Sequence, residues 1–254
     1  MANRTQRKTA KFLDKNPFQN QTMVDYWIDI IRNKRDAFRT YVSDPALFER
    51  LVTLKPHSKV LDLGCGEGYL SRKLASNGHE VVGIDSSSYF ITVAKAARLA
   101  DEQYLVQDAL SLDFPDEYFD AVVSNFVFMD LACPERAIKE SGRVLKSGGR
   151  LIFQILHPFT FTSNSGEIRN SPVINYFKTQ EFSEKFLVAG KESPVEGIRF
   201  HHPLSRYTRA LHDSGLAIIF MDEPTPITST PLNNPIRQIF KKPWFLLIDA
   251  VKKR

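Results

Sequence analysis

Cysteine is scarce in this chain of 254 residues, which contains only Cys65 and Cys133. Two thiols cannot build the disulfide framework of a small secreted domain, and they cannot complete a zinc site by themselves. The histidines show no metal-ligand spacing apart from the adjacent His201 and His202, so we expect no metal site. A reducing, cytoplasmic setting is the corresponding expectation.

Long hydrophobic runs are also missing. The longest, residues 151–156 and 244–251, are interrupted by Gln154 and Asp249. Both are far shorter than the roughly 20 residues that span a bilayer. Residues 1–15 are basic and polar and lack the apolar stretch of a secretory signal. We therefore expect no membrane span.

The positive charge is modest, with a formal net charge of +5, and much of it lies near the two ends of the chain. A nucleic-acid footprint is one interpretation of such charge, and solvated, partly frayed termini are the other. No aromatic interleaving or known binding module accompanies the charge. This favours the second interpretation, so nucleic acid is not an expected partner.

What the sequence does contain is an alternation of strand and helix patterns. The expected strands are residues 59–63, 80–85, 103–107, 121–124, 150–156, 217–221 and 243–251. The expected helices are residues 69–76, a segment from 86–88 to about 100, 134–146 and 204–214. This alternation predicts an α/β fold with a parallel sheet covered on both faces. Ligands of such sheets bind beyond the carboxyl ends of the strands.

The chain is expected to form one domain, residues 21–254, after a flexible basic N-terminus, residues 1–20. Apolar residues at helical spacing predict one amphipathic helix over residues 21–40. Asp44 followed by Pro45 predicts the N-cap and first turn of a second helix. The expected parts of the domain are N-terminal helices (21–58), a core (59–157), an insert (158–200) and a C-terminal part of the sheet (201–254). Because the insert breaks the alternation, we interpret it as a lid over the site.

The segment with the clearest chemical meaning is VLDLGCGEG, from Val60 to Gly68. It places glycines at every second position between a strand and a helix, where the backbone can approach a ligand closely. A dinucleotide site would have Gly-x-Gly-x-x-Gly and a pyrophosphate at the helix N-terminus. Here the third glycine comes one residue early. Asp62 would repel a pyrophosphate, whereas it suits an ammonium or sulfonium cation.

Two further carboxylates end the next two strands. Asp85 is positioned to accept hydrogen bonds from both hydroxyls of a ribose. Asp108 is positioned to accept a hydrogen bond from an adenine amine, and the backbone amide of Ala109 to reach a ring nitrogen. Each residue alone has an ordinary alternative, a helix cap for Asp85 and a solvated strand end for Asp108. Their order at the ends of consecutive strands is the more specific signal.

In these segments the sequence resembles class I (Rossmann-like) S-adenosylmethionine-dependent methyltransferases, in the small-molecule branch with a core of the ubiquinone/menaquinone-biosynthesis type. The likeness is carried by VLDLGCGEGYLSRKLA, VVGIDSSSYFITVAKA, YLVQDALSLDFPDEYFDAVVSN and AIKESGRVLKSGGRLIFQILHP. A weaker likeness continues in FHHPLSRYTRALHDSGLAIIFMDEPTP and PWFLLIDAVKK. The resemblance implies a Rossmann-like three-layer sandwich whose seven-stranded sheet is mostly parallel with an antiparallel last strand. It also implies S-adenosyl-L-methionine as the cofactor.

The resemblance assigns cofactor roles to residues at the strand ends. The glycines would surround the amino-acid end of the cofactor, Asp85 would bind the ribose, and Asp108 would lie near the adenine. The full set of expected cofactor-binding residues is Asp62, Gly64, Cys65, Gly66, Gly68, Asp85, Ser86, Asp108, Ala109, Asn125 and Phe126.

The expected acceptor is a small molecule of secondary or cofactor metabolism, and methylation of O, N or C is left open. Methyl transfer from a sulfonium mainly requires alignment, and a general base is needed only if the acceptor must lose a proton. His157, at the end of a strand, and His201 and Tyr207, after the insert, are the catalytic candidates. The alternative for His157 is a turn residue before Pro158.

Aromatic residues in the insert and the first helix suggest an apolar lid that clamps the acceptor. The expected acceptor contacts are Tyr26, Trp27, Phe159, Tyr176 and His202. The alternative is a satellite core beneath a long loop. The oligomeric state, monomer or homodimer, is left open.

Three competing functions remain. An RNA methyltransferase is one, although the sequence after the fourth strand, Ser124 to Val127, lacks the Asn/Asp-Pro-Pro-aromatic motif common in enzymes that methylate base amines. A protein that binds the cofactor without transferring methyl is the second. A nicotinamide oxidoreductase is the third, and the glycine spacing and Asp62 argue against it.

Overall fold

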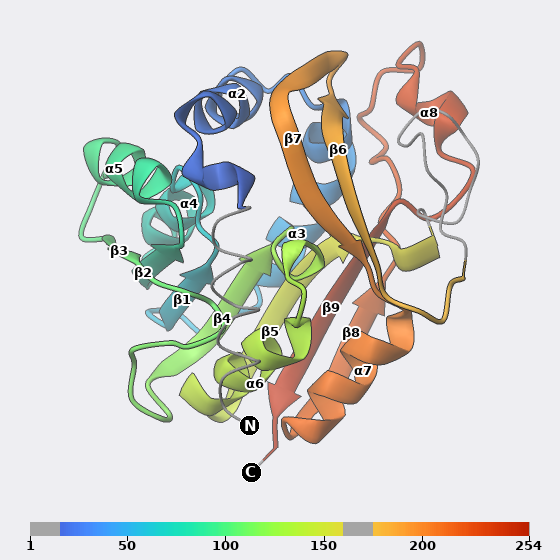
Figure 1. Cartoon of the computed structure of the whole chain (residues 1–254). Helices are drawn as coiled ribbons and strands as arrows, with labels where there is room; N and C mark the ends of the chain where they lie inside the picture. The colour runs from blue at the N-terminus through green and yellow to red at the C-terminus, as the bar shows by residue number, and fades with distance from the viewer. Residues whose placement is uncertain (1–15, 160–174, 254) are drawn as a thin grey trace, which may run out of the picture.

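A seven-stranded sheet with the strand order β3-β2-β1-β4-β5-β9-β8 forms the centre of the molecule (Figure 1). The computed structural model describes residues 16–159 and 175–253. The strands of this sheet are β1 (Lys59–Leu63), β2 (Glu80–Asp85), β3 (Gln103–Val106), β4 (Phe119–Asn125), β5 (Leu145–Leu156), β8 (Leu216–Asp222) and β9 (Phe245–Lys252). The α-helices are α2 (Gln21–Arg32), α3 (Asp44–Leu51), α4 (Tyr69–Ser76), α5 (Ser88–Ala96), α6 (Pro134–Val144), α7 (Leu204–Asp213) and α8 (Ile236–Ile239).

The strand directions confirm the fold class that the sequence predicted. Strands β1 to β5 pair in parallel. The last strand, β9, lies between β5 and β8 and is antiparallel to both. The carboxyl ends of β1, β2, β3 and β4 therefore meet at one edge of the sheet, where ligands bind in this class of fold.

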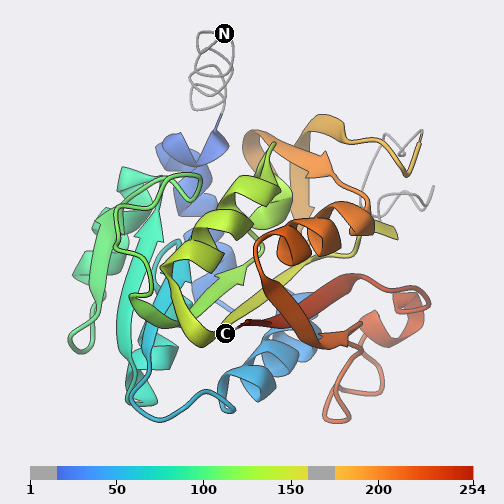
Figure 2. The same ribbon diagram turned by 90° about the horizontal axis from the view of Figure 1, so that it is seen from below.

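Helices cover both faces of the sheet (Figure 2). Side chains of a strand point alternately to opposite faces, and β1 shows the consequence. Val60 packs with residues of α3 and α4, whereas Leu61 and Leu63 pack with residues of α6 and α7. After Lys59, the first residue of the strand, both faces of β1 are apolar except at Asp62, which is buried.

The N-terminal helices differ from the sequence prediction. The single helix predicted over residues 21–40 ends at Arg32, since Lys34 has a positive φ of 48° that breaks the helical path. The chain resumes with the π-helix η2 (Arg39–Ser43), which runs directly into α3. Asp44 is therefore not the predicted N-cap. Its carboxylate instead binds the Arg39 guanidinium, with a shortest N···O distance of 3.2 Å.

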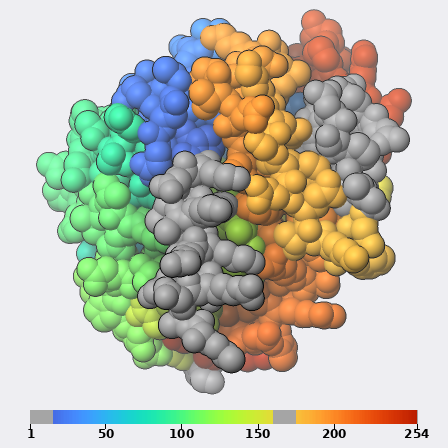
Figure 3. All heavy atoms as spheres, in the orientation of Figure 1, coloured from blue at the N-terminus to red at the C-terminus, as the bar shows by residue number. Residues whose placement is uncertain are grey.

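The described part of the insert is a two-stranded hairpin, β6 (Gln180–Val188) and β7 (Lys191–His201). Its turn has positive φ at Ala189 and Gly190, as tight hairpin turns require. The hairpin is tied to α2 by Tyr26, whose hydroxyl donates to the Lys191 carbonyl at 2.9 Å. Figure 3 shows α2 (blue) and the hairpin (orange) adjoining on one face. Residues 160–174 of the insert lie outside the described residues.

The N-terminus was predicted to be flexible through residue 20. Residues 1–15 lie outside the described residues, but Pro17–Gln19 form the 3-10 helix η1, so the prediction is wrong for this turn. The Asn16 side chain caps η1 by accepting a hydrogen bond from the Phe18 N–H. Within the described residues, no helix is both long and apolar enough to cross a membrane.

Candidate functional site

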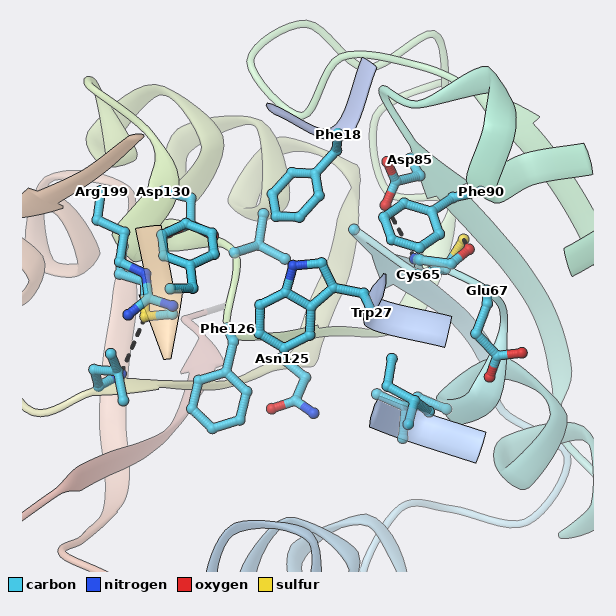
Figure 4. Close-up of a pocket in the computed structure, with 18 of the residues that line it drawn as sticks. Phe18, Trp27, Cys65, Glu67, Asp85, Phe90, Asn125, Phe126, Asp130 and Arg199 are labelled. Atoms are coloured by element: carbon cyan, nitrogen blue, oxygen red, sulfur yellow. Dashed lines mark hydrogen bonds between the residues drawn. The ribbon is translucent and has the colours of Figure 1, made fainter. Parts of the chain in front are cut away.

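A cavity of about 570 Å³ opens at the carboxyl ends of β1, β2, β3 and β4. Figure 4 shows Asp85 and Glu67 on one side of it, Arg199 and Phe126 on the other, and Trp27 between them. The first side is built by the sheet, and the second by the loop after β4 and the hairpin β6–β7, with α2 between them. The cavity thus has a sheet end and a hairpin end.

The loop after β1 forms the floor of the sheet end. The amides of Gly64 and Cys65 both donate to the Ile84 carbonyl at 2.8 Å, which holds the turn against β2. Gly64, Gly66 and Gly68 have φ values of +77°, +54° and +85°, a region that disfavours other residues. A Cβ on Gly66 would meet nothing within 4 Å. Gly66 therefore leaves open space where a ligand can approach the backbone.

Asp85, at the end of β2, faces this open space. Its carboxylate accepts hydrogen bonds from the Gly66 amide at 3.0 Å and the Ser87 amide at 2.9 Å. Burial raises the pKa of Asp85 to about 6, against the lowering effect of these amides. Each oxygen keeps a lone pair for a further donor.

Asp62 is a second carboxylate at the same end. Its exposed fraction is 1%, and it accepts a hydrogen bond from the Ser71 hydroxyl at 2.5 Å. Burial, together with the nearby charge of Asp85, raises the pKa of Asp62 to about 7. A buried carboxylate and a partly buried one along the same cavity favour a ligand that brings positive charge and hydrogen-bond donors.

The loops after β3 and β4 complete the wall. Asp108 and Ala109 line the cavity after β3, and the Asp108 carboxylate accepts from the Leu110 amide at 2.9 Å. At the end of β4, the Asn125 side-chain oxygen accepts from the Gln154 amide group at 3.2 Å. Phe126 has a φ of +61°, and such backbone strain in non-glycine residues clusters at ligand sites.

All the residues predicted to bind a cofactor line the cavity except Gly68. A Cβ on Gly68 would lie 2.7 Å from the Tyr104 hydroxyl. Gly68 therefore allows the start of α4 to pack closely against β3.

The residues predicted to be catalytic lie elsewhere. His157 does not line the cavity. Its Nε2 lies 3.1 Å from a carboxylate oxygen of Glu223, and its Nδ1 accepts from the Phe159 amide at 3.1 Å. Its backbone amide donates to the Trp244 carbonyl at 2.9 Å. His157 thus connects the end of β5 to neighbouring segments, and we assign it no catalytic role.

His201 and Tyr207 are also outside the cavity. The His201 Nε2 lies 2.8 Å from the Tyr176 carbonyl oxygen. The Tyr207 ring is 2% exposed and packs near the rings of Phe153 and His202. Both residues are enclosed in the packing of the hairpin and α7, so neither can reach a substrate in the cavity.

Of the predicted acceptor contacts, only Trp27 lines the cavity. The Nδ1 of His202 accepts from Arg206 at 2.8 Å, so its Nε2 carries the proton that it donates to the Leu131 carbonyl at 2.8 Å. Burial lowers the pKa of His202 to about 4. Tyr176 accepts a hydrogen bond from a backbone amide of α7, Tyr26 anchors the hairpin, and Phe159 is about half exposed.

Comparisons with known proteins agree with this geometry. Residues 61–153 match the family model described as a methyltransferase domain. Demethylmenaquinone methyltransferase from Thermotoga maritima is 39% identical over 115 residues, which cover 44% of this chain and 49% of that protein. Ubiquinone biosynthesis O-methyltransferase from Coxiella burnetii is 36% identical over 114 residues, covering 43% of this chain and 47% of that protein. The chain spans about half the length of the curated relatives it matches.

A solved structure extends the likeness over most of the chain. A Listeria monocytogenes protein provisionally assigned as an S-adenosylmethionine-dependent methyltransferase has a TM-score of 0.68 at 26% identity. The match covers 83% of this chain and 98% of that one. Residues 61–153 thus match a methyltransferase domain, and the sheet that contains them has the fold of class I S-adenosylmethionine-dependent methyltransferases.

Sequence reasoning missed a clamp between this methyltransferase domain and its N-terminal helices. Glu67, within the glycine loop, is 1% exposed and binds both Arg72 of α4, at 2.7 Å, and Arg32 of α2, at 3.1 Å. The clamp holds α2, and with it Trp27, against the loop. Arg32 and Glu67 are 35 positions apart in the chain, so no local pattern marks the pair.

The turn η1 was also missed. The Asn16 side chain donates to the Ser86 hydroxyl at 3.0 Å, and the Gln19 side chain donates to the Ser86 carbonyl at 2.8 Å. The Phe18 ring packs against Phe90 with centroids 5.8 Å apart. The turn thereby covers the cavity beside Asp85. The dipeptide Asn16-Pro17 is a turn signal that could have indicated it.

Proposed function

We propose that this chain is an S-adenosylmethionine-dependent methyltransferase that acts on a small molecule bound at the hairpin end of the cavity. The observation that carries the proposal is the sheet end. There the buried carboxylate of Asp62 and the partly buried carboxylate of Asp85 flank the open space above Gly66. The curated relatives, which are named for quinone biosynthesis, support a role in cofactor metabolism.

The sheet end suits the proposed cofactor. S-adenosylmethionine, when bound, supplies a methyl group activated on a sulfonium sulfur. Asp85 would accept hydrogen bonds from the ribose hydroxyls, and Asp62 would balance the positive charge of the amino-acid end. Asp108 and Ala109 would lie along the adenine. Ser86, held by η1, would close this part of the cavity.

The hairpin end suits an apolar acceptor. Trp27, Phe126 and Phe186 line it, and such surfaces exclude water and hold a flat molecule. No histidine of the described residues lines the cavity. An acceptor that is already ionised needs no protein base. The chain would then act mainly by holding the acceptor in line with the methyl group.

The remaining features of the proposal concern partners and setting. We propose a small molecule rather than a nucleic acid as acceptor, because the lining at the hairpin end is mainly aromatic and aliphatic, with Arg199 as its one basic residue, and not a run of basic residues. The setting proposed is cytoplasmic, which is supported by Cys65 and Cys133, both free thiols among the described residues. The proposal leaves the oligomeric state open between a monomer and a homodimer.

The experiment is a methyl-transfer assay with the full chain, methyl-labelled S-adenosylmethionine and a panel of hydroxylated aromatic acceptors, including quinols. We expect label in an extracted small-molecule product and formation of S-adenosylhomocysteine in equal amount. Label that appears only in added RNA would contradict the choice of acceptor. Tight cofactor binding with no transfer to any acceptor class would favour the non-transferring alternative.

A further inference from the structure

Arg199 is the one basic side chain that the hairpin directs into the described cavity. It lies near the end of β7, and its guanidinium carbon sits 3.9 Å from the centre of the Phe186 ring on β6. Figure 4 shows it across the cavity from Asp85, beside Asp130 and close to Phe126. Arg199 therefore belongs to the acceptor end of the cavity and not to the cofactor end.

The guanidinium is poorly satisfied by the protein. Among residues 16–159 and 175–253, no carboxylate lies within ion-pair distance of Arg199, and no acceptor receives a hydrogen bond from its side chain. Stacking on an aromatic ring stabilises a cation but satisfies none of its five N–H donors. Partial burial of such a group costs free energy that a ligand can recover.

Burial lowers the pKa of Arg199, and the nearby Asp130, Glu184 and Tyr26 offset only part of that effect. Because guanidinium groups stay protonated in proteins, the hairpin end presents a positive charge. Asp130 lies on the same side of the cavity and partly offsets that charge. The fork of donors on Arg199 matches the two oxygens of a carboxylate.

We infer that the methyl acceptor is an aromatic carboxylate, whose carboxylate binds the guanidinium of Arg199 and whose ring lies against Trp27 and Phe186. This inference rests on the proposed function, since it names the acceptor class for the same site. The carboxylate oxygen that accepts the methyl group carries no proton, so transfer breaks the methyl–sulfonium bond, forms a methyl ester and releases S-adenosylhomocysteine without a protein base, in agreement with the lack of a histidine along the described cavity.

The test measures binding of matched acids and amides to the full chain saturated with S-adenosylhomocysteine. The probes are benzoate, 2-naphthoate and 1-hydroxy-2-naphthoate, each paired with its primary amide, which has nearly the same shape and no charge. Isothermal titration calorimetry gives the affinity of each probe. A charge-assisted hydrogen bond lost on truncation corresponds to a change of about 10- to 100-fold. We expect the wild type to prefer at least one acid over its amide by about tenfold or more.

Three variants separate the role of Arg199 from general effects of charge. Arg199→Gln should lose the preference for the acid and keep the wild-type affinity for S-adenosylhomocysteine. Arg199→Lys should retain part of the preference, because it keeps the charge without the fork. Arg209→Gln removes an exposed arginine of α7 outside the cavity and should change neither affinity.

Asp130→Asn should change the affinity for the acid in the opposite direction from Arg199→Gln. Removing this carboxylate from beside Arg199 should tighten binding of the acid and leave the amide unchanged. If the substitution instead disturbed the structure of the hairpin end, binding of both the acid and the amide would weaken.

The outcomes distinguish the inference from the function beneath it. If no acid in the series binds better than its amide, or if Arg199→Gln keeps the preference, the inference is overturned while the cofactor site stands. If the wild type binds no S-adenosylhomocysteine, the proposed function fails, and the inference fails with it.

Discussion

The three glycines of the loop after β1 meet different surroundings, although each has a positive φ. A Cβ on Gly64 would lie 2.2 Å from a methyl carbon of Val127, inside the packed protein. A Cβ on Gly66 would project into the cavity. The first glycine is therefore required for packing and the second for ligand approach.

This contrast gives a pair of opposite expectations. Gly66→Ala should cost about 1–2 kcal/mol of stability for a left-handed alanine, and it should weaken binding of S-adenosylhomocysteine by about tenfold or more, because its Cβ occupies the ligand's space. Gly64→Ala should cost a further ~1–3 kcal/mol through overpacking. Thermal melting and calorimetric titration measure both effects. A Gly66→Ala protein with wild-type affinity would show that no ligand approaches this backbone.

A second expectation at the residue scale concerns pH. Burial raises the pKa of Asp62 to about 7 and that of Asp85 to about 6. A bound ammonium group favours the ionised carboxylate, so binding near pH 6.5 should release protons. Affinity for S-adenosylhomocysteine should fall as the pH is lowered from about 7 to about 5. Calorimetry in two buffers with different ionisation enthalpies counts the protons. Asp62→Asn should reduce the release, and proton uptake by the wild type would contradict this role.

The same pKa shifts make folding stability depend on pH in the opposite direction from ligand affinity. In the unfolded chain these carboxyls titrate near 3.9, so the folded protein binds their protons more tightly. Their contribution to stability is therefore greatest at low pH and decreases as the pH rises from about 4 through 7. If the free energy of unfolding of the ligand-free protein instead rose between about pH 4 and 7, and Asp62→Asn removed that rise, the buried position of Asp62 would be contradicted.

At the scale of elements, the hairpin β6–β7 forms the cavity wall that we propose holds the acceptor, and Gly197 fixes its shape. A Cβ at Gly197 would lie 2.0 Å from the ring of Phe186, so any larger residue must displace that ring. Phe186 in turn contacts Trp27, with ring centroids 6.1 Å apart, and carries Arg199 on its face.

We therefore expect Gly197→Ala to raise the KM for the acceptor and leave the affinity for S-adenosylhomocysteine unchanged, because only the hairpin end is disturbed. Steady-state kinetics with a confirmed acceptor and titration with S-adenosylhomocysteine provide the two readouts. Ser183→Ala, on the exposed side of β6, is a matched control. If Gly197→Ala weakened S-adenosylhomocysteine binding as much as it raised the KM for the acceptor, the hairpin could not be said to affect the acceptor alone.

The elements also show what the sequence could predict. The bounds of β1, α4 and β2 agree with the prediction, because apolar strand residues, glycines and the helix stop at Asn77-Gly78 are local signals. The cavity lining at the sheet end could also be predicted from these elements, because the residues predicted to bind the cofactor lie at or just after strand ends, and all but Gly68 line the cavity. The break after α2 could not be predicted, because nothing in the sequence indicates the positive φ of Lys34.

The lining of the hairpin end could not be predicted from local signals. His202 bonds to the Leu131 carbonyl, 71 positions away, and that distant contact makes it a structural residue. No sequence motif singles out Arg199, and the hairpin that contains it was not predicted. Packing between distant segments decided which polar residues face the cavity.

At the scale of the whole molecule, the antiparallel β9 is fixed by a buried charge. Asp249 on β9 is fully buried and pairs with Arg50 of α3 at 2.8 Å and with Arg150 of β5. The triad joins a helix and two strands, and none of its three residues lines the cavity. Removing one partner of a buried ion pair leaves the others uncompensated.

Asp249→Asn should therefore cost about 3 kcal/mol and lower the melting temperature by about 6–12 °C. Because the triad is outside the cavity, the folded variant should keep its affinity for S-adenosylhomocysteine. Calorimetric melting and titration below the transition test both statements. A variant with unchanged stability would mean that solvent or neighbouring groups already compensate the arginines.

The most direct measurement is calorimetric titration of the full chain with S-adenosylhomocysteine, repeated on Asp85→Asn. This substitution keeps the shape of the side chain and removes the charge and one acceptor that face the cavity. We expect micromolar binding to the wild type and a loss of about 10- to 100-fold in the variant, with circular dichroism confirming that both are folded. No binding to the folded wild type, or equal binding to both proteins, would contradict a cofactor site built on Asp85.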